Sequence, residues 1–288
     1  MIRRLKYFAI LLFLVFVVFM AASGWRSLSP KPPADQTLSV LTYNIGSAPS
    51  LEPDTDEISE VIQWNVVDDL DIILVQDSPW KVKMKDLAKS LGFAHYLSGR
   101  DMSHKNNSGI LSRLPLKNPK SIRLPSKYPR PGALCAEVEF AGKTILVCSI
   151  HLSTLTFELN RMVSEGEAYF SSVLSLMYDE AFRETEHSRG IDKLLTWIDT
   201  KQYDAIIVGG DFNTFLFSKT IRAMTNRFED ALWPSPDYFY GTYTRFDFPI
   251  KPRIDYIFHS PDVKCLEAGI IPITAGDHYP IRALFDLP

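Results

Sequence analysis

The segment Ile206-Ile207-Val208-Gly209-Gly210-Asp211-Phe212-Asn213 does most to decide the fold of this 288-residue chain. Its first three residues are apolar and β-branched, which predicts a short strand buried in a layered sheet. Asp211 and Asn213 follow this strand directly, at the kind of position where folds place functional side chains rather than core. The segment therefore predicts a buried strand with a functional site at its end.

Polar residues stand at the ends of other apolar runs as well. Taken singly, each has an ordinary explanation: Asn44 as a turn former, Asp77 as a helix N-cap, and His151 as a satisfied histidine at a sheet edge. Six such positions in one chain indicate a shared site instead. They are Asn44, Asp77, His151, Asp211 with Asn213, Asp255, and Asp277 with His278.

Short runs rich in Val, Ile and Leu alternate along the chain with amphipathic segments of helical spacing. A tight hairpin is predicted around Gly142-Lys143, so we expect mixed sheets with helices on their faces. Strands are predicted at 38–43, 72–75, 94–97, 109–112, 136–140, 144–149, 205–208, 253–258 and 281–285. Helical segments are predicted at 57–70, 80–91, 158–200 and 220–228.

The N-terminus differs from the rest of the chain, because three basic residues precede an apolar run without acidic residues. About 19 helical residues would span roughly 28 Å, close to the ~30 Å apolar core of a bilayer. We expect a signal-anchor helix or a cleaved signal peptide, with everything that follows exported. The predicted divisions are residues 1–26 for this segment, 27–37 for a Pro-rich linker, and 38–288 for one catalytic domain.

Beyond its first thirty residues the chain is acidic, with 27 Lys and Arg against 34 Asp and Glu. A net charge of about −7 gives an unfavourable global field for a polyanion such as DNA, although it is compatible with a local basic patch. We expect a monomer that meets the membrane through its N-terminal helix.

The three cysteines, Cys135, Cys148 and Cys265, lie in apolar runs without C-x-x-C spacing. This pattern argues against a zinc site and against a disulfide framework. A single Cys135–Cys148 bridge is the alternative in an oxidising compartment.

Six short motifs follow one another along the domain: Leu41-Thr42-Tyr43-Asn44-Ile45, Ser108-Gly109-Ile110-Leu111-Ser112-Arg113, Ser149-Ile150-His151-Leu152, Gly210-Asp211-Phe212-Asn213, Arg253-Ile254-Asp255-Tyr256-Ile257-Phe258 and Gly276-Asp277-His278-Tyr279-Pro280. In this order they resemble the motif series of the endonuclease/exonuclease/phosphatase (DNase-I-like) superfamily. The motif around Asp211 alone is moderately specific, whereas the six together span nearly the whole domain.

The resemblance implies a four-layer α/β sandwich, in which two central mixed sheets pack face to face with helices outside. It also implies metal-dependent hydrolysis of phosphoesters, with Mg²⁺ as the cofactor and Mn²⁺ as an alternative. The metal ligands are expected to be Asn44, Asp77 and Asp277. The catalytic residues are expected to be His151, Asp211, Asn213, Asp255 and His278, with substrate contacts from Asn213, His151 and Arg253.

Phosphoester hydrolysis needs an in-line water, a base, and positive charge on the phosphate oxygens. Asp77 and Asn44 offer the hard oxygen ligands that Mg²⁺ prefers. Similarity to the family suggests that His278 takes the proton from water, while Asp277 orients its imidazole or contacts the metal. Asp255 would hold a catalytic histidine in its productive tautomer.

The phosphate itself would meet other residues. His151 and Asn213 are expected to donate hydrogen bonds to its oxygens, and Asp211 to position the nucleophile or bind a second ion.

Three features depart from a compact member of this family. Asp77 stands where the family usually has Glu, which puts metal affinity or preference in question. Residues 157–186 form an insertion, expected either to pack as an extra core helix or to act as a lid or substrate wall beside His151. Ten aromatic residues crowd 215–248 and could stack bases, hold a lipid headgroup, or cover the sheet.

Three functions fit these features. The first is an extracytoplasmic nuclease-type phosphodiesterase, and the second a lipid or inositol-phosphate hydrolase of sphingomyelinase type, which acts on phospholipid or sugar phosphate. The third is a catalytically silent, membrane-anchored binding protein of the same fold. The paired histidines His151 and His278 argue against the third, because binding alone has little need of them.

Overall fold

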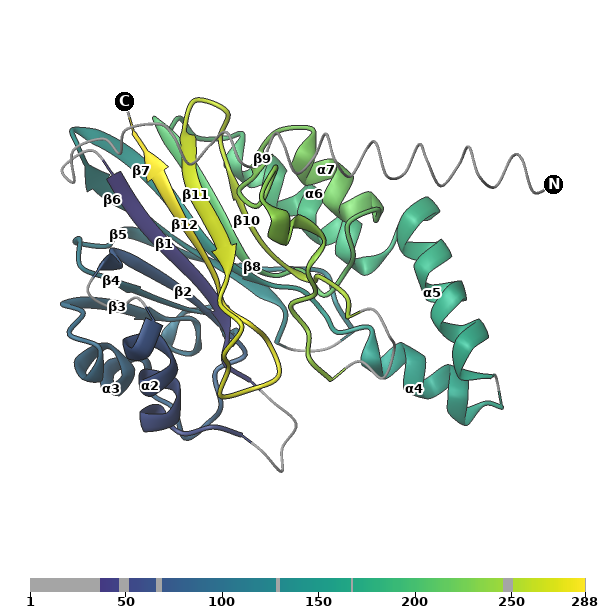
Figure 1. Ribbon diagram of the computed structural model, residues 1–288. Coiled ribbons are helices and arrows are strands. Elements are labelled where there is room, and N and C mark those ends of the chain that lie inside the picture. Colours follow the sequence, from purple (N-terminus) through teal and green to yellow (C-terminus); the bar gives the residue numbers. More distant parts are fainter. Residues whose placement is uncertain are drawn as a thin grey trace.

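The computed structural model describes residues 37–46, 52–65, 69–127, 130–166, 168–245 and 251–287. Within them, two six-stranded mixed sheets pack face to face with helices outside (Figure 1), which confirms the predicted sandwich. The predicted N-terminal segment and nearly all of the predicted linker lie outside the described residues. In the part of the chain that is described, no helix has the length and apolar character needed to cross a membrane.

The first sheet brings residues from both ends of the domain together. Its central strand β1 pairs in parallel with β2, which sets Asn44 opposite Gln76, and antiparallel with the C-terminal strand β12. In order across the sheet, the strands are β11 (Lys264–Ile270), β12 (Ile281–Asp286), β1 (Thr37–Asn44), β2 (Ile72–Gln76), β4 (Gly109–Ser112) and β3 (His95–Ser98).

The second sheet aligns three predicted site residues. Strand β8 pairs in parallel with β7 and antiparallel with β10, which sets Asp211 opposite both His151 and Asp255. In order across the sheet, the strands are β5 (Lys117–Arg123), β6 (Gly132–Phe140), β7 (Lys143–His151), β8 (Ala205–Asp211), β10 (Asp255–His259) and β9 (Glu229–Asp230).

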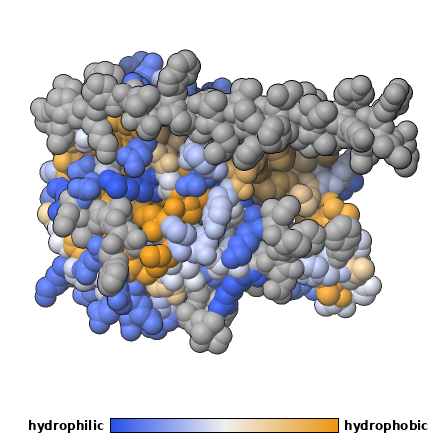
Figure 2. Space-filling view, in the orientation of Figure 1, coloured by the Kyte–Doolittle hydropathy of each residue, from blue (hydrophilic) through white to orange (hydrophobic). Residues whose placement is uncertain are grey.

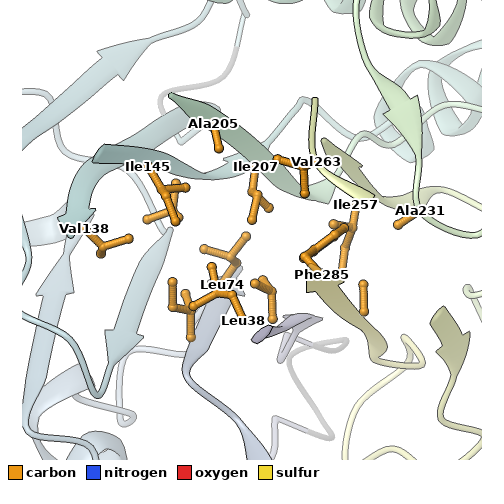
Figure 3. Packing of buried hydrophobic residues seen from close by; sticks show 14 of the residues in the cluster. Leu38, Leu74, Val138, Ile145, Ala205, Ile207, Ala231, Ile257, Val263 and Phe285 are labelled. Carbon is orange, nitrogen blue, oxygen red and sulfur yellow. The ribbon is translucent and has the colours of Figure 1, made fainter. Parts of the chain in front are cut away.

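The main core lies between the two sheets. Leu74 on β2 and Ile207 on β8 are fully buried there, together with side chains from neighbouring strands of both sheets (Figure 3). Burial on both faces explains why β2 is a nearly continuous apolar run and why β1 is buried along almost its whole length. The packing of the sheets therefore fixes how their rims meet.

Helices cover the outer faces of the sandwich. The first sheet is covered by α2 (Thr55–Asn65) and α3 (Met84–Ser90), and the second by α6 (Glu186–Ile198) and α7 (Lys219–Thr225). Two further helices, α4 (Thr156–Ser164) and α5 (Tyr169–Phe182), extend away from the sandwich (Figure 1). Two 3-10 turns are at Gly99–Asp101 and Pro236–Phe239.

The insertion at 157–186 does not form the extra core helix that was one of its two expected arrangements. Leu174 and Met177 on α5 are 50% and 43% exposed. The outer face of the second sheet is already covered by α6 and α7, which leaves α5 no apolar surface of the sheet to bury.

Cys135 and Cys148 form a disulfide, so the single-bridge alternative is the one observed. They lie directly opposite one another on β6 and β7, which places their Cα atoms 4.1 Å apart. Cys265 is free and buried.

A cavity in the core between the sheets should be costly. Leu74→Ala removes a fully buried side chain there, and we expect it to lower the free energy of unfolding by about 2–5 kcal/mol in urea denaturation. The control Leu174→Ala, on the exposed face of α5, should change it by less than about 0.5 kcal/mol. Equal effects of the two variants would contradict the described packing.

Candidate active site

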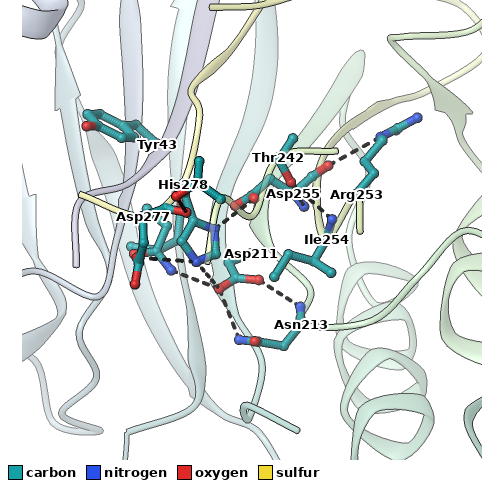
Figure 4. A network of polar contacts seen from close by, with 12 residues as sticks. Tyr43, Asp211, Asn213, Thr242, Arg253, Ile254, Asp255, Asp277 and His278 are labelled. Atoms are coloured by element: carbon teal, nitrogen blue, oxygen red, sulfur yellow. Dashed lines mark hydrogen bonds and ion pairs between the residues drawn. The ribbon is translucent and has the colours of Figure 1, made fainter. Parts of the chain in front are cut away.

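Asp211, at the end of β8, is the centre of a polar cluster at one rim of the sandwich (Figure 4). Its Oδ2 accepts a hydrogen bond from Asn44 Nδ2 at 2.8 Å and from Asn213 Nδ2 at 3.0 Å. The Nε2 atoms of His151 and His278 lie 3.7 and 3.9 Å from the same oxygen. Both sheets thus contribute to one site, as the sequence predicted.

His278 is held by Asp255, in the kind of contact predicted for that aspartate. The Nδ1 atom of His278 lies 2.9 Å from Asp255 Oδ2, so the carboxylate accepts and Nδ1 carries the hydrogen. Thr242 Oγ1 accepts the backbone N–H of Asp255 and fixes the start of β10. The Nε2 edge of the imidazole therefore faces Asp211 and Asp277, the latter at 3.9 Å.

These buried groups strongly perturb one another. Burial alone would lower the pKa of His278, but the negative charges of Asp255 and Asp211 raise it to about 10. Burial raises the pKa of Asp211 to about 6, and the positive charge of His278 opposes that rise. At neutral pH the site therefore contains an imidazolium beside an ionised carboxylate.

The loop that carries Asp277 and His278 is pinned from two sides. The Tyr43 hydroxyl accepts the N–H of Ala275 at 2.9 Å, and Thr244 N–H donates to the carbonyl of Asp277 at 2.8 Å. Gly276 lies so close to Gly46 that a Cβ atom there would be 2.4 Å from the Gly46 carbonyl oxygen. Only glycine permits this approach of the Asp277 loop to the end of β1.

A second group of oxygen donors lies beside this loop. Gly46 N–H donates to Asn44 Oδ1 at 2.9 Å, and a Cβ on Gly46 would meet Asp77 Oδ2 at 2.5 Å. Asn107 Nδ2 donates to the other oxygen of Asp77 at 3.0 Å. Asp77 has a φ of 45°, a left-handed conformation that is uncommon outside glycine. Backbone and side-chain contacts thus fix the direction of its short carboxylate.

Asp277 completes this second group. Burial raises its pKa, the positive charges of His278 and Arg245 oppose this rise, and the negative charge of Asp77 adds a smaller increase. The Nε atom of Arg245 lies 3.8 Å from Asp277 Oδ2, and the Arg245 side chain is one-third exposed.

One set of donors lies close enough together to accept a cation, and the sequence predicts a second set. The ligating atoms of Asp211, Asp255 and His278 all lie within 4.8 Å of one another. In that set, however, His278 is hydrogen-bonded to Asp255 and positively charged, and Asp211 Oδ2 already accepts two amide donors. The oxygen set of Asn44, Asp77 and Asp277 has the donor type that hard divalent cations prefer.

Arg253 does not occupy the substrate-binding position predicted for it. Its side chain is buried, its Nη2 pairs with Asp230, and its Nη1 donates to the carbonyl of Tyr238 at 2.9 Å. It also lies over the rings of Tyr238 and Tyr256. The guanidinium neutralises the buried carboxylate of Asp230. The position of Arg253 in the same motif as Asp255 does not reveal this pairing.

Asn107 and Thr242 were not selected from the sequence, and Tyr243 was considered only as one of the ten aromatic residues of 215–248. The ring of Tyr243 lies 5.1 Å from that of His278, and its backbone forms an isolated bridge with His278. Asn107 directly precedes the Ser108 motif, so its sequence position was the one available signal. Thr242 and Tyr243 lie in an irregular segment, where no periodicity marks them.

The aromatic residues of 215–248 differ in how deeply their side chains are buried. Phe228 is buried against the second sheet, whereas Phe217, Trp233 and Phe239 are mostly exposed. Phe246 and Phe248 lie outside the described residues.

The fold and the site together define an α/β sandwich with a buried His–Asp pair and clustered carboxylates at one rim. The profile of the Endonuclease/Exonuclease/phosphatase family matches residues 41–278. The chain belongs to this family of phosphoesterases. No curated protein sequence matches the chain.

Solved structures share the fold at low sequence identity. An endonuclease/exonuclease/phosphatase from Beutenbergia cavernae DSM 12333 has a TM-score of 0.63 at 19% identity, over 87% of this chain and 72% of that one. D. rerio TDP2 complexed with single strand DNA product has a TM-score of 0.63 at 17% identity, over 87% and 99%. A mannosyl-6-phosphatase from Bacteroides thetaiotaomicron has a TM-score of 0.60 at 16% identity, over 86% and 99%.

The raised pKa of His278 predicts a pH-dependent contribution to stability. The imidazolium stabilises the fold fully below its ordinary pKa of 6.5, and this contribution is lost as pH rises through about 10. His278→Gln removes it, so the stability gap between parent and variant should be large near pH 6 and shrink above about pH 10. Urea denaturation of the metal-free protein measures the gap. His104→Gln, at an exposed position, is the control. A stability difference between the parent and His278→Gln that does not change with pH would contradict the charged state assigned to His278.

Proposed function

We propose that the chain is a divalent-metal-dependent phosphodiesterase of nuclease type that acts outside the cytoplasm. The observation that carries the proposal is the arrangement around His278: Asp255 holds the imidazolium, and carboxylate oxygens of Asp211 and Asp277 each lie 3.9 Å from its Nε2 atom. The TDP2 structure with a single strand DNA product supports the nuclease alternative, and the mannosyl-6-phosphatase supports sugar phosphate as the second candidate. Both similarities concern fold.

The donor chemistry fits Mg²⁺, with Mn²⁺ as an alternative. Asn44, Asp77 and Asp277 would hold the ion, because their side-chain oxygen atoms are the ligands that such cations prefer. The conformation of Asp77 and its contact with Gly46 support its use as a ligand despite its short side chain. When bound, the ion supplies positive charge to a phosphate oxygen as a Lewis acid.

The protein groups divide the remaining chemistry. Because His278 is charged and its Nδ1 is committed to Asp255, its Nε2–H is suited to donate to a phosphate oxygen rather than to accept a proton. We propose this role for His278 in place of the general-base role that the sequence suggested. Asp211, ionised at neutral pH and placed among donors, is the better group to orient water and accept its proton.

His151 and Asn213 border the same oxygen of Asp211. Asn213 Nδ2 also donates to the Leu152 carbonyl at 3.1 Å, which ties the loop after β8 to the loop that follows His151. Nδ1 of His151 is buried and has no hydrogen-bond partner among the described residues. A ring edge that faces Asp211 at 3.7 Å is placed to contact a phosphate bound there.

Turnover of a substrate panel tests the proposal. The full chain should hydrolyse bis(p-nitrophenyl) phosphate and plasmid DNA with Mg²⁺ and lose this activity in EDTA. RNA, sphingomyelin and a hexose 6-phosphate distinguish the alternatives. His278→Ala and Asp211→Asn should each lower kcat by about 10²–10⁴-fold because each removes a proton donor or acceptor at the reaction centre.

The control for this panel is His104→Ala, which changes an exposed histidine and should keep parental turnover. If the parent turned over none of the five substrates with Mg²⁺ or Mn²⁺, the reading as a silent binding protein would replace this one.

The Cys135–Cys148 bond supports the proposed export, because disulfides persist in oxidising compartments. In cells that express the full chain, alkylation of the denatured protein without reductant should label one cysteine, Cys265. A chain that starts at residue 31 and stays in the cytoplasm should label three. Three labelled cysteines in both proteins would contradict export.

A further inference from the structure

The helix α5 is unusual because its buried face is polar. Among its residues with described side chains, only Ser172 and Glu180 are buried. Leu174, Tyr178 and Phe182 are 50%, 55% and 70% exposed, and apolar surface is visible at the right of Figure 2, where Figure 1 shows this helix. Apolar burial therefore contributes little to holding α5 in place, whereas a buried carboxylate makes specific contacts.

Glu180 takes part in a closed set of hydrogen bonds. One of its carboxylate oxygens lies 2.8 Å from His187 Nδ1 on α6, and the other accepts from Thr214 Oγ1 at 2.9 Å. His187 Nε2 lies 2.5 Å from the carbonyl oxygen of Ser153. Glu180 and His187 are 2% and 3% exposed.

The protonation state of His187 follows from these contacts. Both ring nitrogens face acceptors, a carboxylate and a carbonyl, so both must donate and the ring is an imidazolium. Burial opposes the charges of both groups, but their mutual attraction lowers the pKa of Glu180 and raises that of His187. The pair is therefore an ion pair inside the protein.

The other two members of the network lie on the loops of the candidate active site. Ser153 comes two residues after His151, and Thr214 directly follows Asn213. The two loops leave the parallel strands β7 and β8 at the same rim and are already joined through Asn213 and the carbonyl of Leu152. The ion pair thus contacts both loops from behind.

We propose that Glu180 and His187 are positioning residues, which set the loops bearing His151 and Asn213 and attach α5 to these loops. The inference rests on the proposed phosphoesterase function and adds that the 157–186 insertion is part of its machinery. Neither residue touches the reacting atoms, and each acts through Ser153 or Thr214.

Thr214→Val is the decisive variant. Removal of one partner of the ion pair would leave a buried charge and could unfold the protein, whereas this change removes only the hydroxyl donor to Glu180. On bis(p-nitrophenyl) phosphate, kcat should fall by about 10- to 100-fold with KM within about twofold, because misplaced groups slow the chemical step more than they weaken binding. Thr214→Ser should restore kcat.

Two further measurements separate positioning from simple stability. Thr196→Val, the same change on the exposed face of α6, should keep the parental kcat. In histidine-labelled NMR spectra at a temperature where all variants are folded, the His151 ring resonances should shift in Thr214→Val and return in Thr214→Ser. This readout holds even if the parent turns over no phosphoester, in which case the proposed function fails independently.

A parental kcat together with unchanged His151 resonances in Thr214→Val would overturn the proposal. It would leave the ion pair as an attachment of α5 without influence on the site.

Discussion

The hydrogen bond between Asn44 Nδ2 and Asp211 Oδ2, 2.8 Å long and buried, joins the two sheets at the rim where the site lies. Asn44 is the last residue of β1 in the first sheet, and Asp211 is the last residue of β8 in the second sheet. These two strand ends meet because the apolar core between the sheets sets the separation and the angle of the sheets. The geometry of the site is thus a consequence of sheet packing.

Electrostatics gives the site its chemical asymmetry. On one side, Asp255 and Asp211 keep His278 charged inside the protein. On the other, the positive charges of His278 and Arg245 favour the ionised form of Asp277, and the negative charge of Asp77 opposes it more weakly. Under the proposed function, the negatively charged phosphoester would meet two cationic partners, His278 and a divalent ion on the oxygen donors.

The sequence predicted the parts of the molecule that local pattern controls. Apolar residues predicted buried strands such as β1 and β8, and the polar residues at the ends of these strands lie together at one rim of the sandwich. Strands β5, β9 and β11 were missed because they carry polar or exposed residues at sheet edges, where burial imposes no pattern. The segment 158–200 was expected as one amphipathic stretch and is divided among three helices.

Within the site, residue type was predictable and pairing was not. Asp255 was expected to hold a histidine, but only three-dimensional proximity shows that the histidine is His278. Arg253 was assigned to substrate because the sequence does not reveal its pairing with Asp230. That pairing depends on how β9 meets β10. Glu180 and His187 gave no signal at all, since their contacts join positions far apart in the chain.

The central claim is that the cation and the charged histidine occupy different halves of the site. Anomalous diffraction from crystals of the protein soaked in Mn²⁺ tests it most directly. The account predicts an anomalous peak in contact with the carboxylates of Asp77 and Asp277 and the side chain of Asn44, with the His278–Asp255 hydrogen bond intact. A peak held instead by Asp211, Asp255 and His278 would contradict it.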